Sequence, residues 1–183
     1  MELVVGLIGR IGSGKTVAAK YLTRRYNADY RRFSQIFMDI LERLNLPKNR
    51  RNLQKLGRML RKEFSQDVIV NAFEKDLRDC CSDMIVVDGI RYENEVELLR
   101  RYPHNILVYI HSNPEDRYGR VRKRAEKGEA AISWEEFEQA DNRETEKYIK
   151  RLKERADYII NNSGSIEDLE RGVDKIMERE VNI

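Results

Sequence analysis

The sequence contains only two cysteines, and they are neighbours, at positions 80 and 81. Adjacent cysteines suit neither a framework of disulfide bonds nor a metal site built on C-x-x-C spacing. The two histidines, His104 and His111, have no carboxylate or cysteine at ligand spacing, so we treat both as structural residues. This cysteine usage indicates a reducing compartment, and we expect a cytoplasmic protein.

Long hydrophobic runs are absent as well. No apolar stretch approaches the length that spans a membrane, and the first residues lack the charged, apolar and small-residue pattern of a signal peptide. We therefore expect no membrane partner.

An excess of charge of one sign is also missing. The 35 lysines and arginines face 32 aspartates and glutamates, so the net charge is only +3. Such a balance argues against a general nucleic-acid binder, and local clusters of charge matter more than the total.

Short apolar runs alternate with helical patterns along the chain, which predicts a parallel sheet covered by helices. The first run, Leu3 to Ile8, is continuously apolar, as expected of a strand buried on both faces. The length suits one domain, so we predict a single α/β domain over residues 1–183 with a five-stranded parallel sheet. The expected strands cover residues 3–8, 29–33, 84–88, 106–110 and 158–160. The expected helices cover residues 15–26, 34–44, 93–101 and 133–156, and two more lie between 52 and 79. Ser34 is expected to cap the helix at 34–44, another helix begins at Pro114, and Ser165 caps the last one.

The most specific motif follows the first strand and matches G-x-x-x-x-G-K-[ST]. Its glycines allow turns that point successive backbone N–H groups at one anion, and the loop runs into the N-terminus of a helix, which favours negative charge. We predict that the loop binds ATP, with the lysine on the β- and γ-phosphates and the threonine hydroxyl on Mg²⁺. The alternative is a glycine-rich turn without function. The predicted ATP-binding residues are Gly9, Arg10, Ile11, Gly12, Ser13, Gly14, Lys15 and Thr16.

A second group of candidate residues follows the strand that ends at Asp88. The carboxyl ends of parallel strands meet at one edge of a sheet, so Asp88 is expected near the same phosphates, where it would hold Mg²⁺. Arg91 lies three residues further on and is suited to bind a phosphate with two nitrogens. The alternative is an aspartate in a turn and an arginine on the surface.

Three arginines, Arg117, Arg120 and Arg124, share one face of the helix that opens at Pro114. A solvated basic helix would show the same pattern, because acids nearby offer partners. The segment around Gly128 that follows is typical of a lid, and a closing lid with arginines supplies cations and excludes water.

These motifs resemble those of the P-loop nucleoside and nucleotide kinase superfamily over nearly the whole chain. Asp88-Gly89-Ile90-Arg91 resembles the D-G-F-P-R run of adenylate kinases without its proline, and residues 120–124 are similar to the R-x-x-x-R that begins their lid. Residues 156–165 resemble the A-D-x-x-I-x-N-x-G of dephospho-CoA kinases, and residues 86–101 resemble phage-type deoxynucleoside monophosphate kinases.

The resemblance implies a P-loop NTPase three-layer sandwich, with a helical acceptor-side region at about 34–79 and a small lid at about 117–145. It also implies that Arg120 packs on adenine and that Arg124 contacts phosphate. The closing run of the lid carries Gln139 where its arginine is expected, and Arg143 is the candidate to compensate.

The acceptor is less well defined than the donor. The D-x-x-x-H motif of dephospho-CoA kinases is missing, because Phe33 stands four residues after Asp29. In adenylate kinases the acceptor helix carries an arginine that binds the nucleoside monophosphate, and the comparable stretch 34–38 has none. Arg58, Arg61 and Arg91 therefore become the candidate acceptor-binding residues.

The preferred hypothesis is ATP-dependent phosphoryl transfer to a nucleotide-like acceptor, most simply a (deoxy)nucleoside monophosphate. Lys15, Asp88 and Arg124 would be the catalytic residues, with Thr16 and Asp88 holding Mg²⁺ and Arg117 and Arg143 assisting from the lid. One alternative is transfer to a ribose hydroxyl, as in dephospho-CoA kinases. Another is an adenylate-kinase-like ATPase or nucleotide switch that acts on RNA or protein, and nucleic acid is a partner only under that alternative.

Overall fold

The computed structural model describes residues 3–124, 132–142, 148–149 and 151–181. Within these residues no helix is long and apolar enough to cross a membrane. The order of the elements along the chain is β1 (Leu3–Ile8), α1 (Lys15–Tyr26), β2 (Asp29–Arg32), α2 (Phe33–Arg43), α3 (Arg50–Glu63), α4 (Val68–Arg78), β3 (Met84–Asp88), α5 (Glu93–Arg100), β4 (Asn105–His111), α6 (Pro114–Arg122), α7 (Trp134–Asp141), η2 (Lys153–Arg155), β5 (Tyr158–Asn161) and α9 (Ile166–Glu180).

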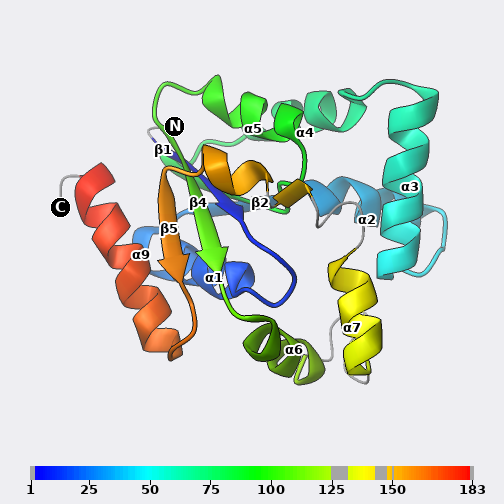
Figure 1. Cartoon of the computed structure of the whole chain (residues 1–183). Helices are drawn as coiled ribbons and strands as arrows, with labels where there is room; N and C mark the ends of the chain where they lie inside the picture. The colour runs from blue at the N-terminus through cyan, green and yellow to red at the C-terminus, as the bar shows by residue number, and fades with distance from the viewer. Residues whose placement is uncertain (1–2, 125–131, 143–147, 150, 182–183) are drawn as a thin grey trace.

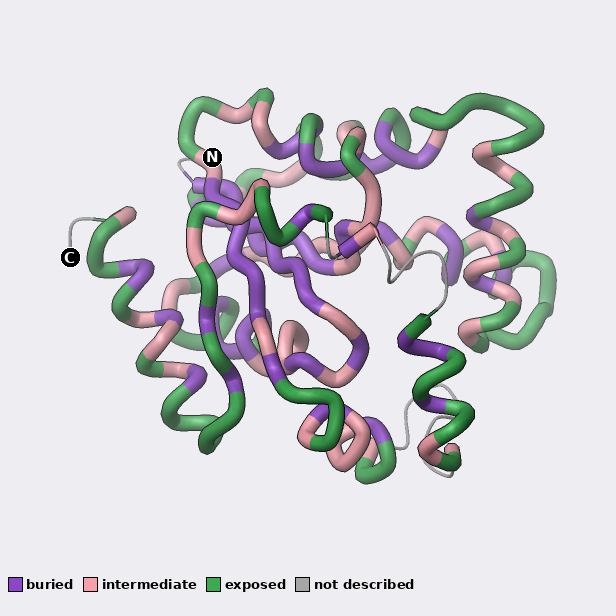
Figure 2. Tube along the Cα trace, viewed as in Figure 1, coloured by how far each residue is buried: buried purple, intermediate pink, exposed green. Residues whose placement is uncertain are grey.

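The five strands form one parallel sheet in the order β2-β3-β1-β4-β5 (Figure 1). The first strand therefore lies in the centre, between β3 and β4. Its six residues are all buried, which agrees with the continuous apolar run in the sequence (Figure 2). The predicted α/β fold with a five-stranded parallel sheet is confirmed.

Two hydrophobic clusters cover the two faces of this sheet. Alternate residues of a strand point to opposite faces, so Val5 and Leu7 join the cluster that contains α1 and α9. Val4 and Ile8 join the other cluster, which contains buried residues of α2, α4 and α5. The result is the expected three-layer arrangement, with helices on both faces of the sheet (Figure 1).

The helical region before β3 is built as predicted, with one shift at its start. Helix α2 begins at Phe33, with Arg32 and not Ser34 at the N-cap position. The Phe33 ring is buried and stacks on Phe73 with 3.9 Å between ring centroids. The predicted cap at Ser165 is confirmed, since its hydroxyl oxygen accepts a hydrogen bond from the Asp168 amide at 3.2 Å.

The long helix expected at 133–156 was wrong in extent. Helix α7 ends at Asp141, residues 148–149 and 151–152 are again helical, and the short helix η2 follows at Lys153–Arg155 before β5. The carboxylate of Asp141, the last residue of α7, contacts two arginines, Arg117 and Arg10. Residues 143–147, within the predicted long helix, lie outside the described residues.

A buried ion pair joins α6 to α7. Arg117 is only 1% exposed, and its two terminal nitrogens donate to the two carboxylate oxygens of Asp141 at 2.6 and 2.8 Å. The guanidinium also lies 5.3 Å from the centre of the Phe137 ring, within a small cluster that includes Val121. The two helices are thus held together by a charge pair and a few apolar side chains.

We expect Arg117→Met to lower the free energy of unfolding by about 3–5 kcal/mol, because it removes the two-pronged partner of a buried carboxylate. Urea denaturation followed by circular dichroism measures this change. The matched control is Arg78→Met, which breaks an exposed pair with Glu74 and should cost less than about 1 kcal/mol. A loss for Arg117→Met no larger than the control would contradict the structural role of the pair.

Candidate functional site

The loop between β1 and α1 has a backbone that only glycine accommodates at two points. Gly12 and Gly14 have φ values of 75° and 109°, and Gly14 caps the N-terminus of α1. A Cβ at Gly12 would lie 2.5 Å from the Arg117 carbonyl oxygen, and one at Gly14 would lie 2.2 Å from Nδ2 of Asn162. The loop is therefore packed against the segments after β4 and β5.

Three side chains donate hydrogen bonds to the carbonyl groups of this loop. Arg117 donates to the Ile11 carbonyl at 3.2 Å, and Arg120 donates to the Gly12 carbonyl at 3.4 Å. The Asn162 amide donates to the Ser13 carbonyl at 2.8 Å. Because a peptide's C=O and N–H point in opposite directions, these bonds favour a loop whose N–H groups face an anion.

Lys15 and Thr16 follow the loop at the start of α1. The Lys15 ammonium donates to the carbonyls of Gly9 and Arg10, at 2.7 and 3.2 Å, so it lies folded over the loop. The Thr16 hydroxyl oxygen accepts a long hydrogen bond, 3.4 Å, from Arg124. The predicted pair of lysine and threonine is therefore beside one of the predicted arginines.

Asp88 lies at the end of β3, which is the second strand of the sheet and lies between β2 and β1. It is 8% exposed, and its carboxylate accepts hydrogen bonds from the Gly89 amide at 2.7 Å and from the Tyr30 hydroxyl at 2.9 Å. Both donors fix the orientation of the carboxylate.

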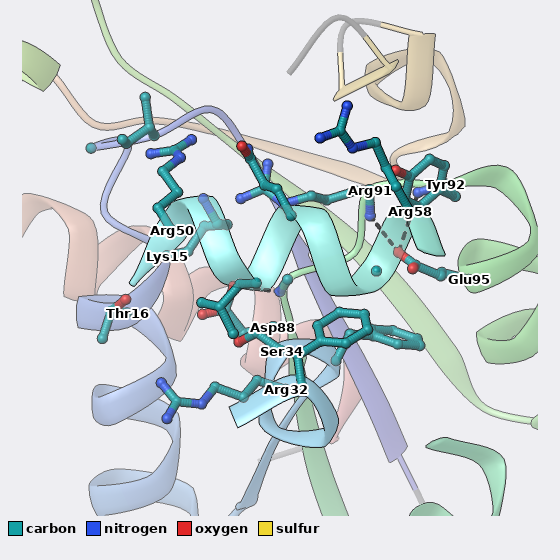
Figure 3. A pocket seen from close by; sticks show the side chains of 18 of the residues that line it. Lys15, Thr16, Arg32, Ser34, Arg50, Arg58, Asp88, Arg91, Tyr92 and Glu95 are labelled. Atoms are coloured by element: carbon teal, nitrogen blue, oxygen red, sulfur yellow. Dashed lines mark hydrogen bonds between the residues drawn. The ribbon is translucent and has the colours of Figure 1, made fainter. Parts of the chain in front are cut away.

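One cavity of about 500 Å³ joins these residues to the helical region before β3. In Figure 3, Lys15, Thr16 and Arg50 lie toward one end, Arg58 and Arg91 lie toward the other, and Asp88 lies between. The cavity is rich in cations and aromatic rings and contains two acids. Its arginines are Arg32, Arg50, Arg58, Arg61, Arg91 and Arg124; its aromatic residues are Tyr30, Phe33, Phe37 and Tyr92; its acids are Asp88 and Glu95.

Glu95 organises the end of the cavity that is remote from the loop. Its carboxylate is 1% exposed and accepts hydrogen bonds from Arg61 Nη2 at 3.0 Å and from the amides of Arg91 and Tyr92 at 2.6 and 3.2 Å (Figure 3). Burial raises the pKa of Glu95, and these donors oppose the rise. The Arg61 guanidinium in turn lies 4.2 Å from the centre of the Tyr92 ring.

The arginines predicted to form a lid have different environments. Arg124 lines the cavity, whereas Arg117 is buried in its pair with Asp141, which corrects the prediction that it assists the transferring phosphate. Arg120 donates to Ser112 Oγ at 2.9 Å and to the Asn162 carbonyl at 2.8 Å, and its packing on adenine stays a prediction. Arg143 lies outside the described residues.

The sequence did not single out Glu95, Asn162 or Asp141 as site residues. Each had a weak local signal: Glu95 and Asn162 lie within the runs that resemble other kinases, and Asp141 lies in the run that resembles the end of a lid. Asp141 also contacts the loop directly, because Arg10 Nη2 lies 3.1 Å from its Oδ2. The partners of these three side chains are distant in sequence, so spacing alone does not reveal them.

Similar sequences extend over nearly the whole chain. A UPF0200 protein from Hyperthermus butylicus is 27% identical over 178 residues, covering 97% of this chain and 95% of that protein. A UPF0200 protein from Methanocaldococcus jannaschii is 29% identical over 184 residues, covering 98% of this chain and 91% of that protein.

Several solved structures share the fold, two of them structures of kinases. A shikimate kinase from Bacteroides thetaiotaomicron superposes with a TM-score of 0.60 at 16% identity, covering 99% of both chains. A gluconokinase from Sinorhizobium meliloti superposes with a TM-score of 0.59 at 10% identity, covering 96% of this chain and 94% of the other. TT1252 from Thermus thermophilus gives a TM-score of 0.66 at 18% identity and 97% coverage of both chains.

The predicted resemblance to P-loop kinases is confirmed at the level of the fold. A family model described as an AAA domain matches residues 5–170. This range contains the phosphate-binding loop, all five strands except two residues of β1, and the cavity. The chain therefore belongs to the AAA domain family of P-loop NTPases.

Proposed function

We propose that this protein transfers a phosphoryl group from ATP to a nucleotide-like acceptor, most simply a (deoxy)nucleoside monophosphate. The observation that carries the proposal is that one cavity contains Lys15, Thr16 and Asp88 together with a set of arginines on the acceptor side. Transfer between two phosphates requires several cations around the moving group and a fixed position for each partner, and this cavity supplies both.

The donor side follows from the loop. Its backbone amides and Lys15 would hold the β- and γ-phosphates of ATP, and Lys15 would exchange its bonds to the Gly9 and Arg10 carbonyls for phosphate oxygens. Arg124, at the same end of the cavity, would neutralise charge on the phosphoryl group as it moves.

Thr16 and Asp88 fit a magnesium ion, because both supply hard oxygen ligands to one cavity. Among the described residues, no group of three His, Cys, Asp or Glu side chains is placed to hold a metal ion. Further ligands would come from phosphate oxygens and water, as is usual for this ion at nucleotide sites. Bound there, the ion would offset the charge of the phosphates.

The acceptor side combines cations with rings. Arg58, Arg61 and Arg91 would bind the acceptor's phosphate, whose oxygens suit planar guanidinium groups. Phe37 and Tyr92 line the same cavity and would contact a base or sugar. The attacking phosphate oxygen is already anionic and needs no strong base; it bonds to the γ-phosphorus as the bond to ADP breaks.

A hydroxyl acceptor is the second candidate, and Asp88 favours it. This carboxylate faces the cavity in a fixed orientation, which suits a base that takes the proton from an attacking hydroxyl. Two structural neighbours, a shikimate kinase and a gluconokinase, suggest hydroxyl-bearing compounds to include in a test.

We expect ADP release from ATP and Mg²⁺ to rise strongly with one member of a panel of acceptors. The panel contains (deoxy)nucleoside monophosphates, dephospho-CoA, shikimate and gluconate, and ADP is measured by a coupled assay. Lys15→Ala should lower acceptor-dependent turnover about 100- to 1,000-fold, because it removes a cation from the transferring phosphates. Lys20→Ala, an exposed lysine on the same helix, is the control and should change turnover less than about twofold.

Stimulation by a monophosphate supports the preferred proposal, and stimulation by a hydroxyl compound alone replaces it with the second candidate. If no member of the panel raises ADP release above the rate with ATP alone, both proposals fail.

We expect Glu95→Gln to raise the KM for the acceptor about tenfold and to leave the KM for ATP within about twofold. The reason is that Glu95 holds Arg61 and the Arg91 amide at the acceptor end, so its loss releases the arginines that bind the acceptor. Steady-state kinetics with each substrate varied measures both constants.

Two further variants test whether Glu95 acts through Arg61. In an Arg61→Met background, Glu95→Gln should raise the acceptor KM clearly less than it does in the native protein, because one of the partners that Glu95 holds is already gone and only its bonds to the Arg91 and Tyr92 amides remain to be lost. Glu93→Gln alters an exposed carboxylate of the same helix, paired with Arg155, and should have no effect on either KM. An equal rise in both KM values, or an undiminished effect in the Arg61→Met background, would disprove this role.

A further inference from the structure

Positive charge is concentrated in one stretch of the chain, residues 43–62. This stretch contains eight lysines and arginines and no acid, although the whole chain has 35 cations and 32 acids. Outside it, the remaining 27 cations are outnumbered by the 32 acids. Near-neutrality of the chain therefore conceals a local positive field around α3.

Four of these cations form a straight row on one face of α3. They are Arg51, Lys55, Arg58 and Lys62, and their spacings of four, three and four residues place them on one side of the helix. We call this row the α3 strip. It extends roughly 16 Å along the helix axis, at about 1.5 Å per residue.

The α3 strip is exposed at all four positions. Arg51, Lys55 and Arg58 make no ion pair with any residue that the structure describes, and Lys62 has only an exposed contact with its neighbour Glu63 at 3.5 Å. The usual explanation of a charged helix face, pairs of opposite charge that keep it soluble, therefore does not account for this row.

The α3 strip is continuous with the cavity through Arg58, which belongs to both. Arg50 and Arg61 lie on the adjacent face of α3, which lines the cavity. Two apolar side chains are exposed near the end of the strip: Met59 is 50% exposed and Phe64 is 74% exposed.

We propose that the α3 strip binds a single-stranded polynucleotide, whose phosphates follow the four cations past the mouth of the cavity. A row of cations matches a linear series of phosphates, and an exposed phenylalanine at its end offers a surface on which a base can stack. The adjoining cavity has a phosphate-binding loop and several arginines, which favours a nucleotide chain over an acidic protein or an anionic membrane. This inference goes beyond the proposed transfer reaction, because binding along the strip requires neither ATP nor turnover.

The test measures the anisotropy of a fluorescent single-stranded RNA of mixed sequence on addition of the full-length protein without ATP. We expect binding that weakens about 50-fold as salt rises from about 50 to 200 mM, the dependence for roughly four phosphate contacts on a single strand. Arg51→Glu/Lys55→Glu should weaken binding about tenfold or more and halve the salt dependence.

The matched control is Lys175→Glu/Arg179→Glu, which reverses two exposed charges at the same spacing on α9 and should change RNA affinity less than about twofold. Lys15→Ala should also keep RNA binding, whereas the strip variant should keep turnover of a small acceptor. Equal losses in the strip and control variants, or no RNA binding at low salt, would overturn the proposal. So would binding to vesicles of anionic lipid that requires the strip while RNA does not bind.

Discussion

The phosphate-binding loop is held in shape by side chains that donate hydrogen bonds to its carbonyl groups, and most of the site depends on that loop. Three consecutive carbonyls, those of Ile11, Gly12 and Ser13, accept bonds from Arg117, Arg120 and Asn162. Those donors follow β4 and β5, and the strand order β2-β3-β1-β4-β5 places both strands on one side of β1. The sheet order thus brings the donors to the loop, and the shape of the loop is set before any nucleotide arrives.

One of these donors, Arg117, also couples the loop to α7. Asp141, the last residue of that helix, lies between Arg117 of α6 and Arg10 of the loop. A movement of α7 away from α6 would have to break a buried pair with two short hydrogen bonds, which is costly in a protein interior. The C-terminal end of α7 is therefore fixed both to α6 and to the phosphate-binding loop.

The sequence was informative where structure is local. The five strands, most helix bounds and the loop at 9–16 follow from short-range periodicity and glycine spacing, and they were predicted closely. The roles of the α6 arginines were not predicted correctly, because periodicity indicates which residues share a face of a helix but not which residues they contact. Arg117 was expected at a phosphate and is buried against Asp141, 24 residues away. Glu95 was missed for the same reason, since Arg61 lies 34 residues before it.

The distribution of charge links the cavity to the surface of α3. Six arginines line the cavity, and one of the two acids there, Glu95, is bonded to Arg61 and to backbone amides. The remaining field is positive, and low-dielectric walls strengthen it inside a cavity. Residues 43–62 extend that field to the surface without a single acid, while the acids of the chain lie elsewhere. A near-neutral total charge is therefore compatible with a strong local concentration of positive charge on one helix and in the cavity beside it.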